Sequence, residues 1–212
     1  MPFARDPATQ AYYEARAAEY DEWYEGTGRF AALDRPGWAG EVADVVALVA
    51  ALPPARTLDV ACGTAFLTRH LRGYVVALDA SPSMVAIAQA RLTEGVALTG
   101  DGLLLPFADD AFDRVLTGHF YGHLPPAERA RFLAEARRVA RELVVIDSSR
   151  PPEGRPAEGW QERVLNDGSR HRVFKRYLAG PDLARELGGG EVLLDGRWFS
   201  AVRARRPARA PS

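Results

Sequence analysis

The apolar positions of this chain form short runs that alternate with longer amphipathic segments. The runs are rich in Val, Leu, Ile and Ala. Short continuous apolar runs are typical of strands that are buried on both faces of a parallel sheet. The runs that we expect to form strands are residues 58–61, 74–79, 96–99, 113–117 and 143–147.

The segments between and around these runs predict helices and two later hairpins. Periodicity, proline and glycine signals place the helices at residues 8–24, 38–52, 65–72, 127–141 and 181–187, with another that begins at Pro82 after Ser81 as its N-cap. Turn residues place hairpins at 160–177 and 191–203. Strands that alternate with helices predict an α/β domain.

The first apolar run leads into the stretch LDVACGTAFLT at residues 58–68. Gly63 suits a tight turn where backbone approaches a ligand, and Thr64 is a candidate cap for a helix that begins near Ala65. A strand, a turn of small residues and a helix N-terminus together form a site for a nucleotide-like ligand. A dinucleotide site would have G-x-G-x-x-G, and packing alone also explains small residues here.

The second apolar run ends in Asp79, which follows Asp59 by 79 − 59 = 20 positions. An acid at the tip of the second strand, at this spacing, binds ribose hydroxyls in nucleotide-binding folds. A carboxylate can accept hydrogen bonds from both hydroxyls. The alternative is a surface aspartate at a strand end, and we favour the ribose interpretation because of the preceding turn.

The turn, Asp79 and the run LLLPFADDAFDRVL at residues 103–116 resemble class I S-adenosylmethionine-dependent methyltransferases. The resemblance covers roughly residues 12–203. It implies a Rossmann-like, doubly wound sheet of seven strands, mostly parallel with one reversed strand, with helices on both faces. The family's turn is acidic-x-Gly-x-Gly-x-Gly, and Ala61 and Ala65 depart from it. Alanine is a mild departure provided that its φ is negative.

The resemblance also implies which residues bind the cofactor. Tyr13 and Tyr20 would approach its methionine end from an N-terminal lid, although aromatic residues at this spacing also suit a core-facing stripe. Residues after Asp79 would line the adenine pocket, where Met84 could equally be core. The full set of cofactor-binding candidates is Tyr13, Tyr20, Asp59, Ala61, Gly63, Asp79, Ala80, Met84, Asp101, Gly102, Leu103 and Thr117.

The loop GHFYGH at residues 118–123 should face the reaction, because open α/β sheets bind ligands beyond the carboxyl ends of their strands. His119 and His123 are the candidate catalytic residues, and His119 lies nearer the strand end. A hydroxyl acceptor would use a histidine as base, whereas an amine or an activated carbon needs none. We expect no metal, because the glycines and prolines nearby disfavour one helix face carrying both histidines.

Composition narrows the class of protein. The chain has 212 residues and a formal net charge of −1, so no basic field argues for nucleic acid. Cys62 is the only cysteine, which excludes an intrachain disulfide and fits a reducing cytoplasm. No apolar run approaches the ~20 residues that span a membrane. We expect one domain over residues 1–203, with a lid at about 8–52, a substrate-side hairpin at about 160–177 and a disordered tail at 204–212.

These observations predict a cytoplasmic enzyme that transfers a methyl group from S-adenosylmethionine to an oxygen or nitrogen atom of a small molecule, leaving S-adenosylhomocysteine. It would act as a monomer or homodimer. One alternative is a member of the same fold that binds the cofactor without methylating, in a pericyclic or structural role. The other is a nicotinamide-dependent oxidoreductase, which the missing G-x-G-x-x-G disfavours.

Overall fold

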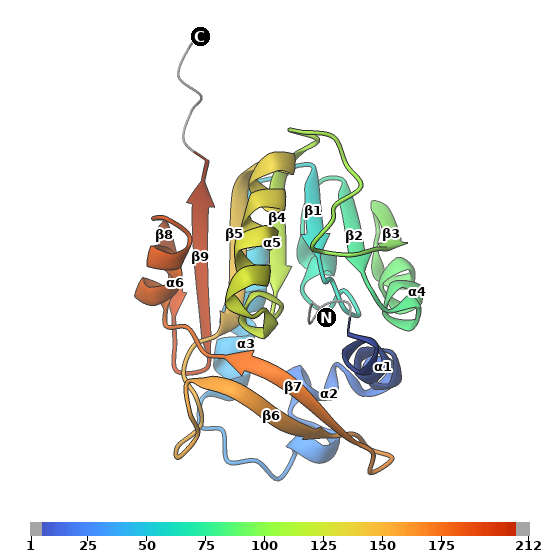
Figure 1. The fold of residues 1–212 in the computed structure, drawn as a ribbon, viewed down its shortest axis with the longest axis vertical. Helices are drawn as coiled ribbons and strands as arrows, with labels where there is room; N and C mark the ends of the chain where they lie inside the picture. Colours follow the sequence, from blue (N-terminus) through green and yellow to red (C-terminus); the bar gives the residue numbers. More distant parts are fainter. Residues whose placement is uncertain (1–5, 207–212) are drawn as a thin grey trace.

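The computed structural model describes residues 6–206, and its centre is a twisted sheet of seven strands (Figure 1). The strand order is β3-β2-β1-β4-β5-β9-β8. The strands are β1 (Thr57–Val60), β2 (Val75–Asp79), β3 (Gly95–Thr99), β4 (Phe112–Gly118), β5 (Ala140–Ser148), β8 (Glu191–Asp195) and β9 (Phe199–Arg205). Each of the five expected apolar runs therefore forms a strand.

The first five strands are parallel, and β9 runs antiparallel to both of its neighbours, β5 and β8. This confirms the mostly parallel sheet with one reversed strand. Strand β1 pairs with β2 on one side and with β4 on the other. The order of the strands therefore runs outward from β1 in two directions, and β1 and β4 flank the point where it reverses. Ligands bind outside the carboxyl ends of the strands at such a point.

Helices cover both faces of the sheet. They are α1 (Pro7–Arg16), α2 (Glu22–Glu25), α3 (Trp38–Ala51), α4 (Pro82–Arg91), α5 (Pro126–Val139) and α6 (Gly180–Glu186). One core cluster includes Phe132 of α5 and Leu183 of α6, and the other includes Val49 of α3 and Ala88 of α4. The apolar sides of the helices thus cover both faces of the sheet, as the alternation of strands and helices in the sequence predicts. None of the helices in residues 6–206 is long and apolar enough to cross a bilayer.

A separate two-stranded hairpin lies across the carboxyl ends of the large sheet, beside α1 and α2 (Figure 1). It consists of β6 (Glu158–Val164) and β7 (Arg170–Arg176), with Trp160 opposite Phe174. Gly168 in the connection has a φ of 85°, which glycine adopts without strain. The predicted hairpin is therefore present, as a separate two-stranded sheet that contacts α1 and the turn Tyr121–His123 rather than as an edge of the main sheet.

Three expectations about the elements are wrong. The helix expected over residues 8–24 ends at Arg16, continues as a 3₁₀ turn and resumes as α2. The helix expected over residues 65–72 is absent, since Ala65 is left-handed and only Thr68–His70 forms a 3₁₀ turn. Residues 204 and 205 belong to β9 rather than to a disordered tail, because they pair with β5; the rest of that tail, 207–212, lies outside the described residues.

Candidate cofactor site

A cavity of about 750 Å³, counted out to its open mouth, lies at the carboxyl ends of β1, β2 and β4. Its walls come from α1, the turn after β1, the end of β2, the loop after β3 and the loop after β4. Of the fourteen candidate residues, eleven line it: Tyr13, Tyr20, Ala61, Gly63, Asp79, Ala80, Met84, Asp101, Gly102, His119 and His123. The structure therefore brings together residues that are more than 100 positions apart in the sequence.

The carboxylate of Asp79 is held by backbone at the tip of β2. Its Oδ2 accepts a hydrogen bond from the Gly63 amide at 2.8 Å, and its Oδ1 accepts one from the Ser81 amide at 2.9 Å. Burial raises the pKa of Asp79, and these backbone amides oppose that effect. Asp79 thus ties the turn after β1 to the start of α4, and its carboxylate borders the cavity.

The turn after β1 has left-handed backbone at every small position of the motif. The φ angles are 58° at Ala61, 54° at Gly63 and 61° at Ala65. The condition under which alanine would be a mild departure, a negative φ, is therefore not met at either position. A non-glycine residue held in this region costs about 1–3 kcal/mol, so the surrounding contacts must enforce it. This geometry is the one that the family's glycines adopt without strain.

The expected cap residue, Thr64, has another role. Its hydroxyl donates to Oδ1 of Asp21 at 2.5 Å instead of capping a helix. Asp21 also forms an ion pair with Arg91 of α4 at 2.6 Å, and Glu14 of α1 accepts from the hydroxyls of Ser81 and Ser83. The N-terminal segment is thereby fastened to α4 on two sides of the cavity.

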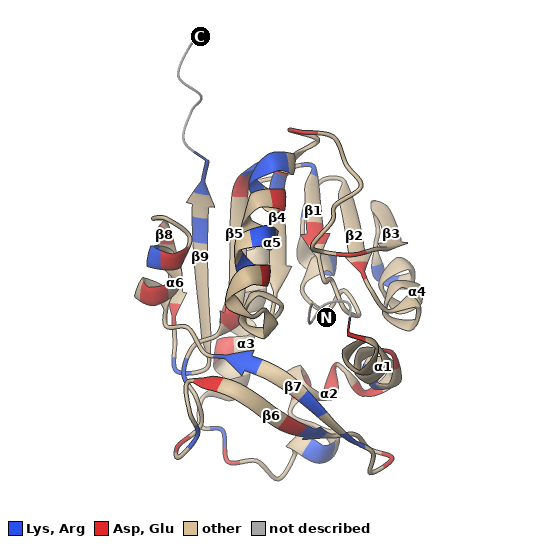
Figure 2. Ribbon diagram, in the orientation of Figure 1, with Lys and Arg blue, Asp and Glu red and all other residues tan. Residues whose placement is uncertain are grey.

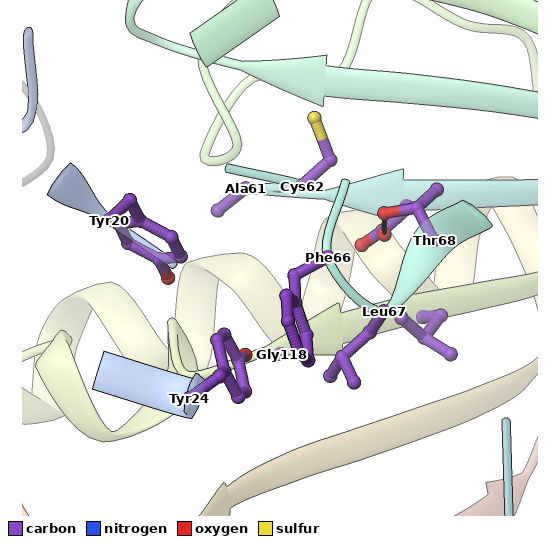
Figure 3. A pocket seen from close by; sticks show the side chains of 10 residues that line it. Tyr20, Tyr24, Ala61, Cys62, Phe66, Leu67, Thr68 and Gly118 are labelled. Carbon is purple, nitrogen blue, oxygen red and sulfur yellow. Dashed lines mark hydrogen bonds between the residues drawn. The ribbon is translucent and has the colours of Figure 1, made fainter. Parts of the chain in front are cut away.

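A smaller cavity, of about 260 Å³, adjoins the first and shares Tyr20, Ala61 and Gly118 with it (Figure 3). Tyr24 and Phe66 stack at 4.0 Å between ring centroids and close one side. Asp59 also lines this smaller cavity and does not line the larger one. The two cavities therefore lie on either side of shared lining residues at the turn after β1.

Asp59 has an unsatisfied oxygen in this region. Its Oδ2 accepts from the Thr68 hydroxyl at 2.5 Å, whereas its buried Oδ1 has no hydrogen-bond partner. Burial raises the pKa of Asp59 to about 7, and the neighbouring Asp79 charge acts in the same direction. A buried carboxylate oxygen without a partner costs free energy, and a ligand with a donor or a positive charge would remove that cost.

Two candidates fall outside both cavities. The Thr117 hydroxyl donates to the Val60 carbonyl oxygen at 2.7 Å inside the sheet. The Leu103 amide donates to Oδ1 of Asp101, and its side chain is buried in the core. Sheet and core contacts occupy both residues, and their role in binding the cofactor stays a prediction. Gly102 does line the larger cavity. A side chain is excluded at this position, because a Cβ there would meet Phe120 and Val60.

His119 presents a buried imidazole that has no hydrogen bond. Its side chain is 7% exposed and neither ring nitrogen has a partner. The ring packs edge-on against Trp23 at 4.7 Å and Phe199 at 5.5 Å between centroids. Burial lowers the pKa of His119 to about 3, although Asp147 at 3.9 Å acts in the opposite direction. The imidazole is therefore neutral at physiological pH, with one donor and one acceptor nitrogen.

His123 is held by the hairpin. Its Nδ1 lies 2.6 Å from the Phe174 carbonyl oxygen, which can only accept, so Nδ1 carries the proton. Burial lowers the pKa of His123 well below its usual value, and Lys175 acts in the same direction. The two candidate histidines are thus neutral and differ in their partners. No group of three metal-ligating side chains gathers here or elsewhere in residues 6–206.

The comparisons with known proteins agree with this geometry. The sequence profile of a family described as "Methyltransferase domain" matches residues 58–144, from β1 to β5. A structure described as "DhpI-SAH complex structure" is 25% identical, covers 95% of this chain and 97% of its own, and has a TM-score of 0.70. Residues 58–144 thus match a methyltransferase domain, and the whole chain is similar in fold to class I S-adenosylmethionine-dependent methyltransferases. A second structure, "DhpI-SAM-HEP complex", is 24% identical with a TM-score of 0.74, covers 94% of this chain and 96% of its own, and supports the fold.

Curated relatives of this chain match over a shorter range. The demethylmenaquinone methyltransferase of Thermotoga maritima is 34% identical over 111 residues, which is 49% of this chain and 48% of that protein. The protein of the same name from Thermus thermophilus is 38% identical over 113 residues, or 48% and 50% of the two chains. The chain thus spans about half the length of the curated relatives that it matches.

Sequence reasoning missed several residues of the site. Gly118 and Phe120 line the larger cavity, and their only signal was their position in the loop after β4. The ion pair between Asp147 and Lys175 was also missed. Lys175 is the only lysine in the chain and is 3% exposed, and its isolation among arginines was its only signal in the sequence.

Proposed function

We propose that this protein binds S-adenosylmethionine in the larger cavity and transfers its methyl group to a small-molecule acceptor. The observation that carries the proposal is the convergence of the turn after β1, Asp79 and Asp101 on one cavity at the switch point of the sheet. Asp79 would hold the ribose hydroxyls, and Asp101 with Met84 would border the adenine.

The residues at the other end of the region fit the methionine portion of the cofactor. Asp59 offers a buried, unpartnered carboxylate oxygen, which suits an ammonium group. A side chain at Gly63 would crowd the lid side of the turn, since a Cβ there would lie 3.3 Å from the Tyr20 ring. The cofactor would supply an electrophilic methyl group on a sulfonium.

The protein's task is then to align an acceptor atom and to exclude water. Alignment of this kind supplies roughly 7–11 kcal/mol of the barrier reduction. The acceptor's lone pair forms the new bond to the methyl carbon, and the electrons of the broken bond stay on sulfur. For a hydroxyl acceptor, the acceptor nitrogen of neutral His119 receives the hydrogen bond and the departing proton. Asp147, at 3.9 Å, stabilises the imidazolium that forms.

The acceptor atom defines two versions of this proposal. The unpartnered His119 favours an oxygen or nitrogen acceptor that carries a hydrogen. The names of the matched relatives, which are demethylmenaquinone methyltransferases, make a quinone-type ring the other acceptor to test. Turnover with a panel of hydroxyl, amine and hydroquinone compounds, read as S-adenosylhomocysteine formed and as the mass of the product, separates them.

Calorimetry with S-adenosylhomocysteine and with NAD(H) tests the cofactor assignment. We expect the former to bind and the latter to give no heat. Binding of NAD(H) alone would favour the oxidoreductase alternative and overturn the proposal. Tight binding of S-adenosylmethionine without turnover of any acceptor would instead favour a non-methylating member of the fold.

A further inference from the structure

Lys175 of β7 is a buried cation on a hairpin whose other charged side chains lie nearer the surface. Charged residues mark both strands of this hairpin (Figure 2), and Glu158, Glu162 and Arg172 are exposed. Lys175 is 3% exposed, and its Nζ donates a hydrogen bond to Oδ1 of Asp147 at 2.5 Å. A lysine is almost never fully buried unless it is paired, because its ammonium group loses its hydration. The hairpin therefore places one fixed positive charge against the carboxyl end of β5.

Asp147, the partner of Lys175, also faces His119. Oδ1 of Asp147 lies 3.9 Å from Nδ1 of His119, and neither nitrogen of that imidazole has a hydrogen-bond partner. A carboxylate at this distance favours the imidazolium form of a histidine, whereas a neighbouring ammonium group disfavours it. The same carboxylate oxygen therefore has two competing partners, and Lys175 is the one that it binds.

The contacts around Gly122 fix this arrangement. The Gly122 amide donates a hydrogen bond to Oδ2 of Asp147 at 2.7 Å, and Oδ1 accepts one from the Ser148 amide at 2.8 Å. A Cβ at Gly122 would lie 2.5 Å from the Arg176 carbonyl oxygen and 2.8 Å from Oδ1 of Asp147. The backbone of β7 is thus packed directly against the loop after β4, so the distance between the two charges depends on how the hairpin is seated.

The other groups around His119 have smaller electrostatic effects on it. Its ring packs against uncharged aromatic side chains, which are Trp23, Tyr24 and Phe199. His123, four residues along the same loop, is itself neutral, since burial and Lys175 lower its pKa. Burial has the largest effect on the pKa of His119, and Arg16 of α1 lowers that pKa less than Lys175 does. Asp147 and Lys175 are therefore the charged groups with the largest effect on whether His119 holds a proton.

We propose that Lys175 is a positioning residue for methyl transfer: by holding Asp147, it keeps the imidazole of His119 neutral, with one nitrogen able to accept a proton. Without Lys175, the carboxylate would hold His119 as an imidazolium, which has no acceptor nitrogen. This inference rests on the proposed function with a hydroxyl acceptor. The hydroxyl oxygen bonds the methyl carbon, its proton passes to His119, and the electrons of the broken carbon–sulfur bond stay on sulfur. Asp147 then stabilises the charged imidazole only after the proton has moved.

The charge of His119 is measurable by NMR on the full chain without any ligand. Its ring nitrogens are titrated between about pH 4.5 and about pH 8.5, which brackets the ordinary histidine pKa of ~6.5. His119→Gln identifies its signals among the four histidines of the chain. We expect the imidazole of the unmodified protein to stay neutral throughout, because its pKa is about 3.

Lys175→Gln removes the charge and keeps a hydrogen-bond donor for Asp147. We expect the pKa of His119 to rise by about 1–3 pH units in this variant, the effect of an opposite charge within about 4–6 Å. The pH profile of kcat should then gain an inflection on its acid side, since the protonated imidazole cannot accept the proton of the acceptor. If this variant does not fold in buffer, the titration is repeated with trimethylamine N-oxide, which favours the folded state.

Three further variants control for structure. Lys175→Arg keeps the charge, and we expect the pKa of His119 to stay low. Lys175→Gln combined with Asp147→Asn also removes the carboxylate, so the inflection should disappear. Arg185→Gln removes an exposed arginine of α6 that pairs with Asp182, and His119 should titrate as in the unmodified protein.

The outcomes separate this inference from the proposed function. Titration of His119 near pH 6.5 in the unmodified protein overturns the role of Lys175, as does an unchanged pKa in Lys175→Gln. An equal rise in Lys175→Gln and Lys175→Arg also overturns it, since lost packing rather than lost charge would then be the cause. If Lys175 controls the charge of His119 but no acceptor is turned over, the proposed function fails while the electrostatic relation between the two residues stands.

Discussion

Asp147 at the end of β5 and Lys175 on β7 form an ion pair of 2.5 Å, with 0% and 4% of the two side chains exposed. Asp147 also accepts hydrogen bonds from the amides of Gly122 and Ser148. Burial alone would raise the pKa of Asp147, but Lys175 and the nearby histidines bring it to about 2. The pair attaches the hairpin to the main sheet directly beside His119.

Lys175→Met should therefore destabilise the fold strongly. Removing one partner of a buried pair leaves the other charge uncompensated and typically costs about 3–5 kcal/mol. The double variant Lys175→Met with Asp147→Asn should recover part of this loss. Urea denaturation measures both. Arg185→Ala, which breaks an exposed pair with Asp182, is the control and should cost less than about 1 kcal/mol. A similar small loss for Lys175→Met would contradict the prediction.

Asp79→Ala should weaken binding of S-adenosylhomocysteine by about 1.5–3 kcal/mol, the range for a hydrogen bond to a charged group. The same change leaves the Gly63 and Ser81 amides without their acceptor, so some loss of stability will accompany it. Calorimetry measures the affinity, and Asp182→Ala on the surface of α6 serves as the control. Unchanged affinity would remove Asp79 from the site.

Replacing the strained alanines by glycine should not destabilise the protein. Left-handed backbone costs alanine roughly 1–2 kcal/mol, and the extra flexibility of glycine in the unfolded chain offsets about 0.4–1 kcal/mol of the relief. We therefore expect Ala61→Gly and Ala65→Gly each to raise the free energy of unfolding by about 0–1.6 kcal/mol. Ala86→Gly, at an exposed position inside α4, should lower it by about 0.5–1 kcal/mol. Equal losses at all three positions would show that the left-handed φ values carry no strain.

Asp59→Asn should change how stability depends on pH. The folded pKa of Asp59 is raised to about 7 from 3.8, so the folded state retains a proton that the unfolded state releases. Between these two pH values the contribution of Asp59 to the free energy of unfolding falls as pH rises. The fall is at most ~1.4 kcal/mol for each pH unit. Asparagine cannot ionise, so the stability of the variant relative to the unmodified protein should increase from pH 4 to 7. A pH-independent difference would contradict the raised pKa.

His119→Ala should slow turnover and leave affinity for S-adenosylhomocysteine nearly unchanged. His119 receives the proton of a hydroxyl acceptor, and a pKa of about 3 makes it a weak base, so we expect kcat to fall by about 10²-fold, the lower end of the range for a general base. Because the pKa of His119 is about 3, kcat should show no inflection near pH 6.5 in the unmodified protein. An inflection there that disappears in the variant would mean that substrate binding restores an ordinary histidine pKa.

Much of this architecture is predictable from local patterns. The buried strands are predictable because they are continuous apolar runs. The start of α4 is predictable from Ser81 and Pro82, and the Ser81 hydroxyl accepts a hydrogen bond from the Met84 amide as an N-cap does. Asp79 is identifiable because it ends the second apolar run, 20 positions after Asp59 in the first run.

Other features depend on contacts between distant segments and have no local signal. The expected helix after Ala65 is replaced by an irregular turn in which Thr68 bonds Asp59, and helical periodicity in the sequence cannot reveal such a contact. The break in the N-terminal helix after Arg16 likewise coincides with Asp21 reaching Thr64 and Arg91. The ion pair between Lys175 and Asp147 likewise has no local signal, because it joins β7 to β5.

The N-terminal segment from α1 to α2 is attached at both of its sides, and this has a consequence for the catalytic cycle. Glu14 and Asp21 attach it to α4 and the turn after β1, while Glu19 and Glu22 accept hydrogen bonds from Asn166 at the hairpin tip. Exchange of spent cofactor for fresh requires these attachments to separate. Departure of S-adenosylhomocysteine, rather than the chemical step, should therefore set the steady-state rate, with a pre-steady-state burst of methylated product as its signature.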